Sequence, residues 1–408
     1  MMAQVQVTDI SKKLFHYKNE TDEGLSSILS WWYEHMIDEV NGGFYGSVNN
    51  ENIPDTTAAK GIVLNSRILW AFSAAYNFTT KKEYADIAER AFRYIINHFV
   101  DHEHGGVYWS VDAHGKMLDS KKQIYGLAFC LYGLTEFYKI NRNGMALQFA
   151  KELFSTIEQY SYDRIKGGYI EAFSREWSET ENLRLSDKDG NERKTMNTHL
   201  HIIEAYANLY TIWPDKLVKE RIGRLLEVFD RHFINKENNH LHLFMNDDWE
   251  TQSSLISYGH DIEAAWLLQE CAEIAGYKLY EDRFNELAIL LAEAAAEGLD
   301  QDGGLLYEYE PAENKLIKEK HSWPQAEAMV GFYNAYQLTD NTKYLDHSCD
   351  SWNFIKKNIL DKKNGEWYWG IYEDGSVMQK EKAGFWKCPY HSIRACMEII
   401  KRINSQLK

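Results

Sequence analysis

The feature that most constrains the fold is a turn that recurs six times along the 408-residue chain. Five copies run from an Asp through a Gly into apolar or aromatic residues: DEVNGGFYG, DHEHGGVYW, DRIKGGYIE, DQDGGLLYE and DKKNGEWYW. A degenerate copy, KENNHLHLF, begins at Lys236. Successive copies lie 63, 62, 73, 63 and 62 residues apart, measured between Gly42, Gly105, Gly167, His240, Gly303 and Gly365. Six units of this size fill nearly the whole chain, which indicates a repeat architecture.

Two kinds of helix alternate between the turns. Residues 85–99 are apolar on one face and charged on the other, as in an outer helix, whereas residues 123–138 are apolar nearly all round, as in a helix buried on both sides. We therefore predict an all-α fold, an (α/α)6 barrel (toroid) of six inner and six outer helices with short β-hairpin-like turns. An open α-solenoid is the alternative, but its repeats are usually shorter and lack the Gly-Gly strand. No change in composition marks a second domain, so we expect one domain over residues 1–408.

Composition and charge exclude several classes of function. The formal net charge is −16, and such an acidic surface repels phosphate backbones, so we expect no nucleic-acid partner. The N-terminal residues contain no apolar signal segment, and no segment is apolar for long enough to span a bilayer. The five Cys are odd in number and form no CxxC pair, which favours a reducing compartment. We expect a cytoplasmic monomer with no membrane partner.

The inner helices carry the candidate functional residues at their beginnings. Six segments look like helix N-termini, with Asn or Ser as a possible cap or Pro at the first helical position, and they start at Asn65, Gln123, Asn197, Ser257, Trp323 and Cys388. If the inner helices are parallel, these beginnings meet at one end of the barrel. Side chains suited to proton transfer lie in or near them: Arg67, Tyr125, His201, His260, Glu263, Glu327 and His391.

Each of these residues also has a purely structural interpretation. A single His in a helix is often structural, Glu327 could pair with an interior Arg, and Trp323 or Trp386 could belong to the core. Three His at equivalent places in three repeats argue otherwise, because polar groups on apolar helices are costly to bury without a purpose. We interpret the group as one active site.

Local spacing suggests how two of the imidazoles are held. His260 and Glu263 are three residues apart and share a helix face, so Glu263 is expected to orient His260 and fix its tautomer. His391 follows Pro389 by two residues, which places it in the first turn of a helix. There the helix dipole disfavours an imidazolium and keeps the ring neutral and basic.

Metal, nucleotide and serine-hydrolase chemistry lack support in the sequence. His199 and His201 are two residues apart, so on a helix they face different directions and do not bind one metal. The other two HxH pairs, at His102 and His240, have no nearby cluster with metal-ligand spacing. GxGxxG, GxxxxGK[ST] and GxSxG motifs are absent from the sequence. We predict no metal site.

The segments that hold the candidate residues resemble a known family. AAKGIVLNSRILWAFSAAY, MNTHLHIIEAY, SYGHDIEAAWLL, HSWPQAEAMVGF and FWKCPYHSIRACMEI are similar to motifs of the N-acylglucosamine 2-epimerase superfamily, most closely of its cellobiose 2-epimerase family. The resemblance covers essentially the whole chain. It implies an (α/α)6 barrel and an isomerase that reversibly inverts C2 of the reducing-end glucose in β-1,4-linked disaccharides, with cellobiose and lactose as substrates. It implies no metal or organic cofactor.

The same resemblance assigns roles to individual residues. It places Arg67, His201, His260, Glu263, Glu327 and His391 around the reacting sugar. It implies that Trp323 and Trp386 stack on sugar rings, that Trp266 lines the site, and that Tyr125 and Asn197 contact hydroxyls. Residues 171–195, which include Trp177, are expected to form a loop over the mouth that excludes water.

Epimerisation at C2 needs an open-chain aldehyde, a base for the C2 proton and a donor on the opposite face. We assign His260 and His391 to this pair, with a cis-enediolate between them. Arg67 and His201 would stabilise the charge on the C1 and C2 oxygens. The leading alternative is an aldose–ketose isomerase acting on mannose or a related monosaccharide. A glycoside hydrolase, which needs two facing carboxylates, and a non-catalytic carbohydrate- or protein-binding toroid are further alternatives.

Overall fold

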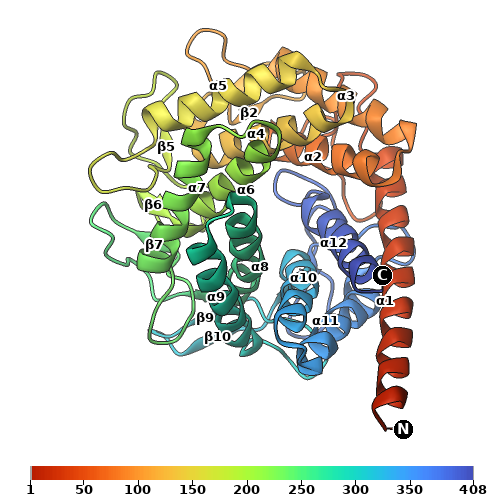
Figure 1. Ribbon diagram of the computed structural model, residues 1–408. Coiled ribbons are helices and arrows are strands. Elements are labelled where there is room, and N and C mark those ends of the chain that lie inside the picture. Colours follow the sequence, from red (N-terminus) through yellow and green to blue (C-terminus); the bar gives the residue numbers. More distant parts are fainter. Residues whose placement is uncertain (1, 408) are drawn as a thin grey trace.

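The computed structural model describes residues 2–407 and confirms an (α/α)6 barrel (Figure 1). Of the domain expected over residues 1–408, Met1 and Lys408 lie outside the described residues. The inner helices are α2 (Ile62–Thr79), α4 (Ile124–Asn141), α6 (Met196–Ile212), α8 (Tyr258–Ala275), α10 (Ser322–Thr339) and α12 (Tyr390–Gln406). The outer helices are α1 (Met2–His35), α3 (Lys82–His98), α5 (Gly144–Tyr160), α7 (Lys216–Val228), α9 (Lys278–Ala296) and α11 (Thr342–Phe354).

Burial separates the two rings as the residue patterns predict. Every residue of α2 from Ile62 to Ala75 is buried, whereas α3 buries a single face built around Ile87, Ala91 and Ile95. The helices predicted over residues 85–99 and 123–138 are α3 and α4. The outer helices α7 and α11 each run into a π-helical turn, η1 (Phe229–Phe233) and η2 (Ile355–Ile359).

Some predicted helix caps are wrong. Asn65 and Asn197 lie inside α2 and α6, whose capping residues are Gly61 and Thr195. Ser257 does cap α8, and Pro389 caps α12 instead of being its first helical residue. The helices α2 and α6 begin earlier than expected because each starts directly after a short strand, Lys60–Gly61 and Lys194–Thr195 respectively.

Short strands join neighbouring units and close the ring. The strand that enters an inner helix pairs antiparallel with the strand after the next turn, as in β1 with β2 and β4 with β5. The last unit pairs with the first through a bridge between Val48 and Ala383, so the barrel is closed. The strands are β1 (Lys60–Gly61), β2 (Ser110–Val111), β3 (Met117–Asp119), β4 (Lys122–Gln123), β5 (Ala172–Phe173), β6 (Lys194–Thr195), β7 (Phe244–Met245), β8 (Ile256–Ser257), β9 (Glu308–Glu310), β10 (Lys315–Ile317), β11 (Lys320–His321) and β12 (Gly370–Ile371).

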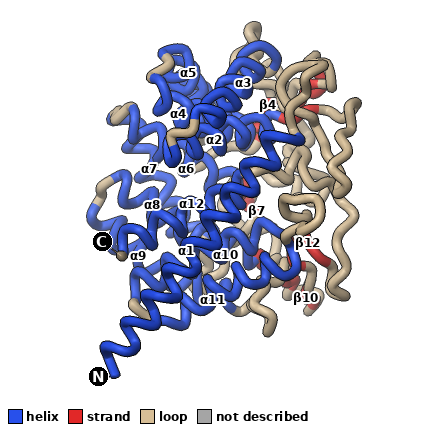
Figure 2. The backbone as a smooth tube through the Cα atoms, turned by 90° about the vertical axis from the view of Figure 1, so that its right-hand side faces the viewer, coloured by secondary structure: helices blue, strands red, loops and turns tan. Residues whose placement is uncertain are grey.

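Long connections gather at one end of the barrel. The connection from an inner helix to the next outer helix is only a few residues long, as between Thr79 and Lys82. The connection from an outer helix to the next inner helix is long, as between α3 and α4, which residues 99–123 separate. Figure 2 shows the strands and most of the loops together on one side, with helices on the other. This end holds the beginnings of all six inner helices.

The recurring turn requires a left-handed residue, and this corrects the alignment of the fourth copy. Gly42, Gly105, Gly167, Gly303 and Gly365 have φ between 75° and 85°. In the fourth copy the matching residue is Asn239, with φ of 62°, and not His240. Its N–H bonds the carbonyl of Asn235, as Gly167 N–H bonds that of Asp163. Asn replaces Gly here because it tolerates this conformation better than most side chains.

Lys–Asp pairs, most of them buried, fasten the turns to the segments that lead into the inner helices. Lys60 Nζ lies 2.8 Å from Asp38 Oδ2, and both side chains are 1% exposed. Equivalent pairs join Lys122 to Asp101, Lys194 to Asp163, Lys320 to Asp300, and Lys382 to Asp361. The fourth unit has lost both partners, since Asn235 and Ile256 occupy the two positions. There Asp261 accepts from Leu241 N–H and contacts His240 Nδ1 at 2.7 Å instead.

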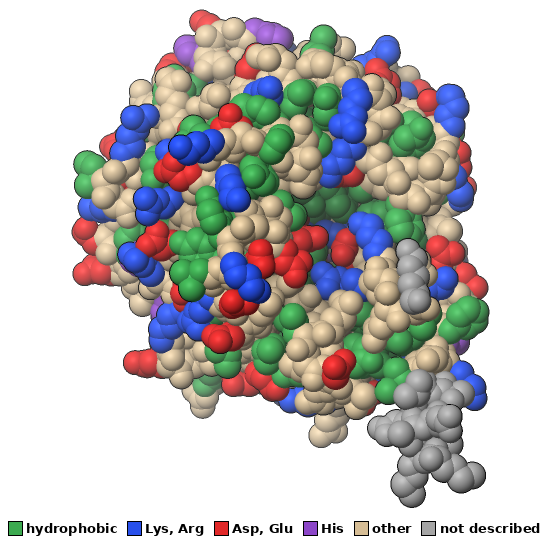
Figure 3. All heavy atoms as spheres, in the orientation of Figure 1, with side chains coloured by type: hydrophobic (Ala, Val, Ile, Leu, Met, Phe, Trp, Pro, Cys, Tyr) green, Lys and Arg blue, Asp and Glu red, His purple; other side chains and the backbone are tan. Residues whose placement is uncertain are grey.

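The cysteines, the hydropathy of the helices and the surface charges can each be compared with the composition. All five cysteines are buried and free, as the sequence predicts. Among residues 2–407, no helix is long and apolar enough to cross a bilayer. Figure 3 shows acidic and basic side chains interspersed over the face turned to the viewer.

The fourth unit suggests a test of the Lys–Asp pair. Lys60→Ile leaves Asp38 buried without its cation and should lower the free energy of unfolding by about 3–5 kcal/mol. The double variant Lys60→Ile/Asp38→Asn copies the fourth unit, removes both charges and should be more stable than the single variant. Urea unfolding followed by circular dichroism measures both, and a double variant no more stable than Lys60→Ile would contradict this interpretation.

Candidate active site

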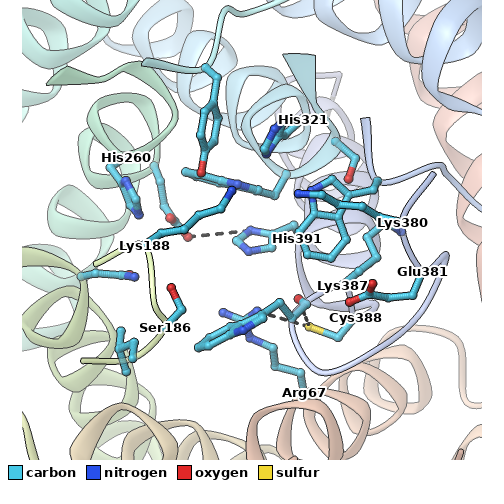
Figure 4. Close-up of a pocket in the computed structure, with 18 of the residues that line it drawn as sticks. Arg67, Ser186, Lys188, His260, His321, Lys380, Glu381, Lys387, Cys388 and His391 are labelled. Atoms are coloured by element: carbon cyan, nitrogen blue, oxygen red, sulfur yellow. Dashed lines mark hydrogen bonds and ion pairs between the residues drawn. The ribbon is translucent and has the colours of Figure 1, made fainter. Parts of the chain in front are cut away.

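A cavity of about 540 Å³ lies at the end of the barrel where the inner helices begin. Figure 4 shows Arg67, His260 and His391 entering it from different helices. Nine of the eleven predicted site residues line this cavity: Arg67, Tyr125, Asn197, His201, His260, Glu263, Trp323, Trp386 and His391. Trp266 and Glu327 are not among the lining residues.

His260 is held by a hydroxyl group and not by the predicted carboxylate. Its Nδ1 lies 2.8 Å from the Oγ of Ser257, the residue that caps α8. Glu263 instead accepts a hydrogen bond of 2.8 Å from Arg394 Nη2, so the prediction that Glu263 orients His260 is wrong. The i, i+3 spacing brings the two side chains to one face, but Arg394 from α12 is the stronger partner for a buried carboxylate.

His391 is held by a carboxylate from a neighbouring inner helix. Its Nδ1 lies 2.6 Å from Glu327 Oε1, so Nε2 is the ring nitrogen left for the cavity. His391 is the second residue of α12 and therefore lies in the first turn, as predicted. The Trp323 ring lies next to both imidazoles, with centroids 4.8 Å from His260 and 5.6 Å from His391.

Glu327 and Trp266 lie behind the cavity wall, which corrects the predicted contacts with substrate. Glu327 is fully buried, and its carboxylate accepts from Trp266 Nε1 at 3.0 Å and from Arg394 Nη2 at 2.7 Å. Glu327 thus pairs with an interior Arg, the structural alternative raised from the sequence. Trp266 is 1% exposed, so it supports Glu327 and does not face a ligand.

Arg67 presents a permanent positive charge in the cavity. Its Nη2 donates to Tyr125 Oη at 2.8 Å, and its Nη1 donates to Cys388 Sγ at 3.2 Å. The guanidinium carbon lies 4.1 Å from the centroid of the Phe129 ring, a geometry in which an aromatic face stabilises a buried cation. A cation fixed in this way is suited to stabilising an oxyanion.

Glu204 and Arg394, two charged residues below the cavity, were not predicted from the sequence. Glu204 contacts His201 Nδ1 at 2.9 Å, and Arg394 joins Glu204 to Glu263 and Glu327. The i, i+3 spacing of His201 and Glu204 is the same signal that drew attention to His260 and Glu263. Arg394 had no local signal, because all three of its carboxylate partners come from other helices.

The mouth of the cavity is formed by two loops. Leu185–Asp189 line it, which confirms that part of the predicted loop over residues 171–195 lies there. Trp177 lies elsewhere, stacked on Tyr160 with centroids 4.4 Å apart. Lys380, Glu381 and Lys387 line the other side, and together with Tyr307, His321 and Trp369 they had no sequence signal beyond the repeat.

Ligand atoms from Glu263, Glu327 and His391 lie within 4.8 Å of one another, as in a metal site. Arg394 Nη2 donates to both carboxylates at 2.8 and 2.7 Å. The guanidinium therefore supplies the positive charge that the two carboxylates require.

Burial keeps the imidazoles neutral. It lowers the pKa of His260 to about 3, with nearby His201 adding to the effect. Burial also lowers the pKa of His391 to about 3, although Glu327 opposes the shift. Both rings are therefore uncharged at neutral pH and available as bases.

Comparisons with known proteins agree on one family. The model described as N-acylglucosamine 2-epimerase (GlcNAc 2-epimerase) matches residues 43–395. The cellobiose 2-epimerase of Bacteroides fragilis is 45% identical over 385 residues, which are 94% of this chain and 98% of that protein. The cellobiose 2-epimerase of Dictyoglomus turgidum is 38% identical over 95% of this chain and 98% of its own length.

Solved structures show the same likeness. Cellobiose 2-epimerase from Bacillus thermoamylovorans superposes with a TM-score of 0.91 and 39% identity, over 95% of this chain and 99% of that chain. A D-mannose isomerase superposes with a TM-score of 0.83 over 94% of this chain and 98% of that chain. At 21% identity, the second likeness shows the fold alone.

The directions of the pKa shifts predict that His260 and His391 differ from His240 in their protonation, which NMR can detect. Burial and neighbouring groups should keep His260 and His391 singly protonated at pH 5, whereas Asp261 raises the pKa of His240 although burial opposes it. Because an unfolded imidazole has a pKa of about 6.5, the unfolded chain binds more protons at these two sites below that pH, and their contribution to stability falls as pH drops. Ring ¹⁵N shifts measure this, and a protonated His260 or His391 at pH 5 would contradict it.

Proposed function

The chain belongs to the N-acylglucosamine 2-epimerase family and is a sugar epimerase of the isomerase class, and from this premise we propose that it inverts C2 of the reducing-end glucose in β-1,4-linked disaccharides. Cellobiose would give glucosyl-mannose, and lactose would give epilactose. The observation that carries the proposal is the pair of neutral imidazoles, His260 and His391, which line one cavity and both adjoin Trp323.

The chemistry requires two proton-transfer groups. The C2 proton of an aldose becomes acidic once the sugar ring is open, because the aldehyde stabilises the negative charge. One imidazole removes the proton, a cis-enediolate forms, and the second imidazole returns a proton to the opposite face of C2. The reaction is reversible, so each imidazole acts as base in one direction and as acid in the other.

The partners of the two imidazoles suit these roles. The Glu327 carboxylate at His391 Nδ1 favours a proton there, so Nε2 is the basic atom, and the carboxylate stabilises the imidazolium that follows. At His260, the Ser257 hydroxyl either donates or accepts, so this contact is compatible with both tautomers. Both contacts are compatible with a neutral or a protonated ring, and we propose no preferred direction.

The remaining lining residues would bind the sugar and stabilise charge. Arg67 and His201 would face the C1 and C2 oxygens, where the enediolate is most negative. Trp323 and Trp386 would stack on sugar rings, and Tyr125 and Asn197 would contact hydroxyls. The loop at Leu185–Asp189 would limit the access of water to the enediolate.

Other parts of the proposal concern the protein as a whole. We propose that residues 1–408 act as a single catalytic domain and as a monomer. We propose that catalysis uses no cofactor, because His260, His391 and Arg67 supply the groups that the reaction needs. The free, buried cysteines support a cytoplasmic location.

The alternative is an aldose–ketose isomerase acting on mannose or a related monosaccharide. It would use the same proton abstraction and enediolate but return the proton to C1. An NMR time course of cellobiose with the protein in D₂O separates the outcomes: glucosyl-mannose for the epimerase, a ketose for the isomerase, and free glucose for a hydrolase.

The first functional prediction concerns the two imidazoles. His260→Ala and His391→Ala should each fold and lose C2 deuterium exchange in cellobiose by at least about a hundredfold. His199 is a matched control on α6, since both of its ring nitrogens bond the backbone, to Tyr169 N–H and Thr195 C=O. His199→Gln should lower stability but keep the exchange per folded molecule. Near wild-type exchange in either Ala variant would remove that residue from the mechanism.

The second concerns binding of the disaccharide. Trp386→Ala should raise KM for cellobiose more than it weakens glucose binding, because a lost stacking surface acts on the second sugar ring. Trp177→Ala is the control, since Trp177 stacks on Tyr160 away from the cavity. Equal losses for cellobiose and glucose would contradict stacking on the second ring.

A further inference from the structure

A buried arginine below the cavity joins carboxylates from three inner helices. Arg394 of α12 is 3% exposed and does not line the cavity. Its Nη1 donates to Glu204 of α6 at 2.6 Å. Its Nη2 donates to Glu263 of α8 at 2.8 Å and to Glu327 of α10 at 2.7 Å. The guanidinium therefore ties four of the six inner helices together one layer beneath the lining residues.

This arginine connects His201 and His391, two imidazoles of the cavity that each have a carboxylate partner. His201 Nδ1 lies 2.9 Å from Glu204 Oε2, and His391 Nδ1 lies 2.6 Å from Glu327 Oε1. A continuous path of hydrogen bonds thus runs from His201 through Glu204, Arg394 and Glu327 to His391. His260 is outside this path, because its Nδ1 partner is Ser257.

Glu204 is also fixed from a second direction. Tyr390 Oη donates to its two oxygens at 2.5 and 2.6 Å, and Tyr390 itself contacts Arg394 Nη1. Arg394 lies between two aromatic faces, with its guanidinium carbon 4.0 Å from the Tyr390 centroid and 4.7 Å from the Trp266 centroid. These contacts leave the Glu204 carboxylate one orientation, with Oε2 directed at His201.

We propose that Glu204 and Arg394 are positioning residues for the reaction: Arg394 holds Glu204 and Glu327 so that each carboxylate fixes the Nδ1–H tautomer of its imidazole, His201 or His391. This inference rests on the proposed function. Neither residue touches the sugar, so both act through the histidines.

The tautomer of His201 decides whether its Nε2 accepts or donates a hydrogen bond in the cavity. With its Nδ1–H donated to Glu204, Nε2 faces the sugar as an acceptor. When Nε2 takes the proton of the sugar hydroxyl from which it accepts, Glu204 stabilises the imidazolium, and the new N–H donates to the oxyanion that the hydroxyl becomes. Other charged or titratable groups around His201 come from four further helices: Arg67, Tyr125, His260, Tyr390 and Arg394.

The number of charged groups around Arg394 supports a single arrangement of protons on its three carboxyl partners. Three buried carboxylates face one guanidinium, so one carboxyl group is the best candidate to hold a proton. Burial and the neighbouring Glu327 raise the pKa of Glu263 to about 8, whereas Arg394 and His391 lower the pKa of Glu327 to about 2 against the effect of burial. Glu204 also has a lowered pKa, since Arg394 and His201 outweigh its burial. The two carboxylates that hold histidines are thus the ionised ones.

Glu204→Gln tests the proposal with almost no change in shape. Arg394 and Tyr390 both donate to Glu204, so they would retain the amide oxygen of Gln and turn its NH₂ toward His201. The imidazole would then carry its proton on Nε2, the wrong tautomer for accepting from the sugar. We expect kcat for C2 exchange to fall at least tenfold, KM to change less than threefold, and ring ¹⁵N shifts to show the switch of tautomer at His201.

Glu158→Gln is the matched control. Glu158 is also a buried carboxylate that accepts from two tyrosines, Tyr169 and Tyr206, and from an arginine, Arg221, but it lies outside the site. It should lose stability while kcat and the His201 shifts stay unchanged. Arg394→Lys should lower kcat like Glu204→Gln, because one ammonium group does not bridge three carboxylates; if it does not fold, Glu204→Gln decides.

The outcomes separate this inference from the proposed function. Wild-type protein without C2 exchange would refute the proposed function, whereas the ¹⁵N shifts would still report the tautomer at His201. An active wild type with unchanged kcat in Glu204→Gln would overturn the positioning role. An Nδ1–H tautomer retained at His201 in Glu204→Gln would overturn it as well.

Discussion

The buried Lys–Asp pair is the interaction on which the rest of the barrel depends. In four of the six units, a Lys in the strand before the inner helix reaches back to the Asp of the preceding turn, as Lys122 reaches Asp101, and in the last unit Lys382 reaches Asp361 from a bend. A buried charge without its partner is costly, so the pair fixes the strand against the turn and thereby the residue at which the inner helix begins. The fourth unit shows the same constraint from the opposite side, because Asn235 and Ile256 replace the two charged partners together.

Once the first residue of each inner helix is fixed, the position of a residue along that helix determines how deep in the barrel its side chain lies. Residues two or three into the helix line the cavity: Tyr125, Asn197, His260, Trp323 and His391. Residues five or six in lie about 4.5 Å deeper and only some reach the cavity: Arg67, His201, Glu263, Glu327 and Arg394. The ninth residues, Glu204 and Trp266, are deeper still and act on their neighbours. The wrong prediction for Trp266 follows from this geometry, since it lies about one turn deeper than Glu263, the deepest residue of α8 that lines the cavity.

The sequence was sufficient for the fold and for most of the cavity because both follow from the repeat. The six turns mark the units, the apolar pattern separates inner from outer helices, and equivalent positions converge when the ring closes. Contact partners were less predictable, because they depend on packing between helices far apart in sequence. Glu263 looked like the partner of His260 from local spacing, yet Arg394, more than a hundred residues away, competes for it. The Lys–Asp pairs were readable in principle, since Lys60, Lys122, Lys194, Lys320 and Lys382 recur just before inner helices or strands.

The layering also resolves an electrostatic conflict in the site. Imidazoles that abstract a carbon-bound proton must be uncharged, and burial achieves this for His260 and His391 by lowering their pKa. The same burial would destabilise the imidazolium formed during the reaction unless an anion is close. The barrel places that anion, Glu327, one turn deeper, where Arg394 neutralises it and where it is out of reach of the substrate. The neutral imidazoles at the surface of the cavity and the paired charges beneath them are therefore two consequences of one helix register.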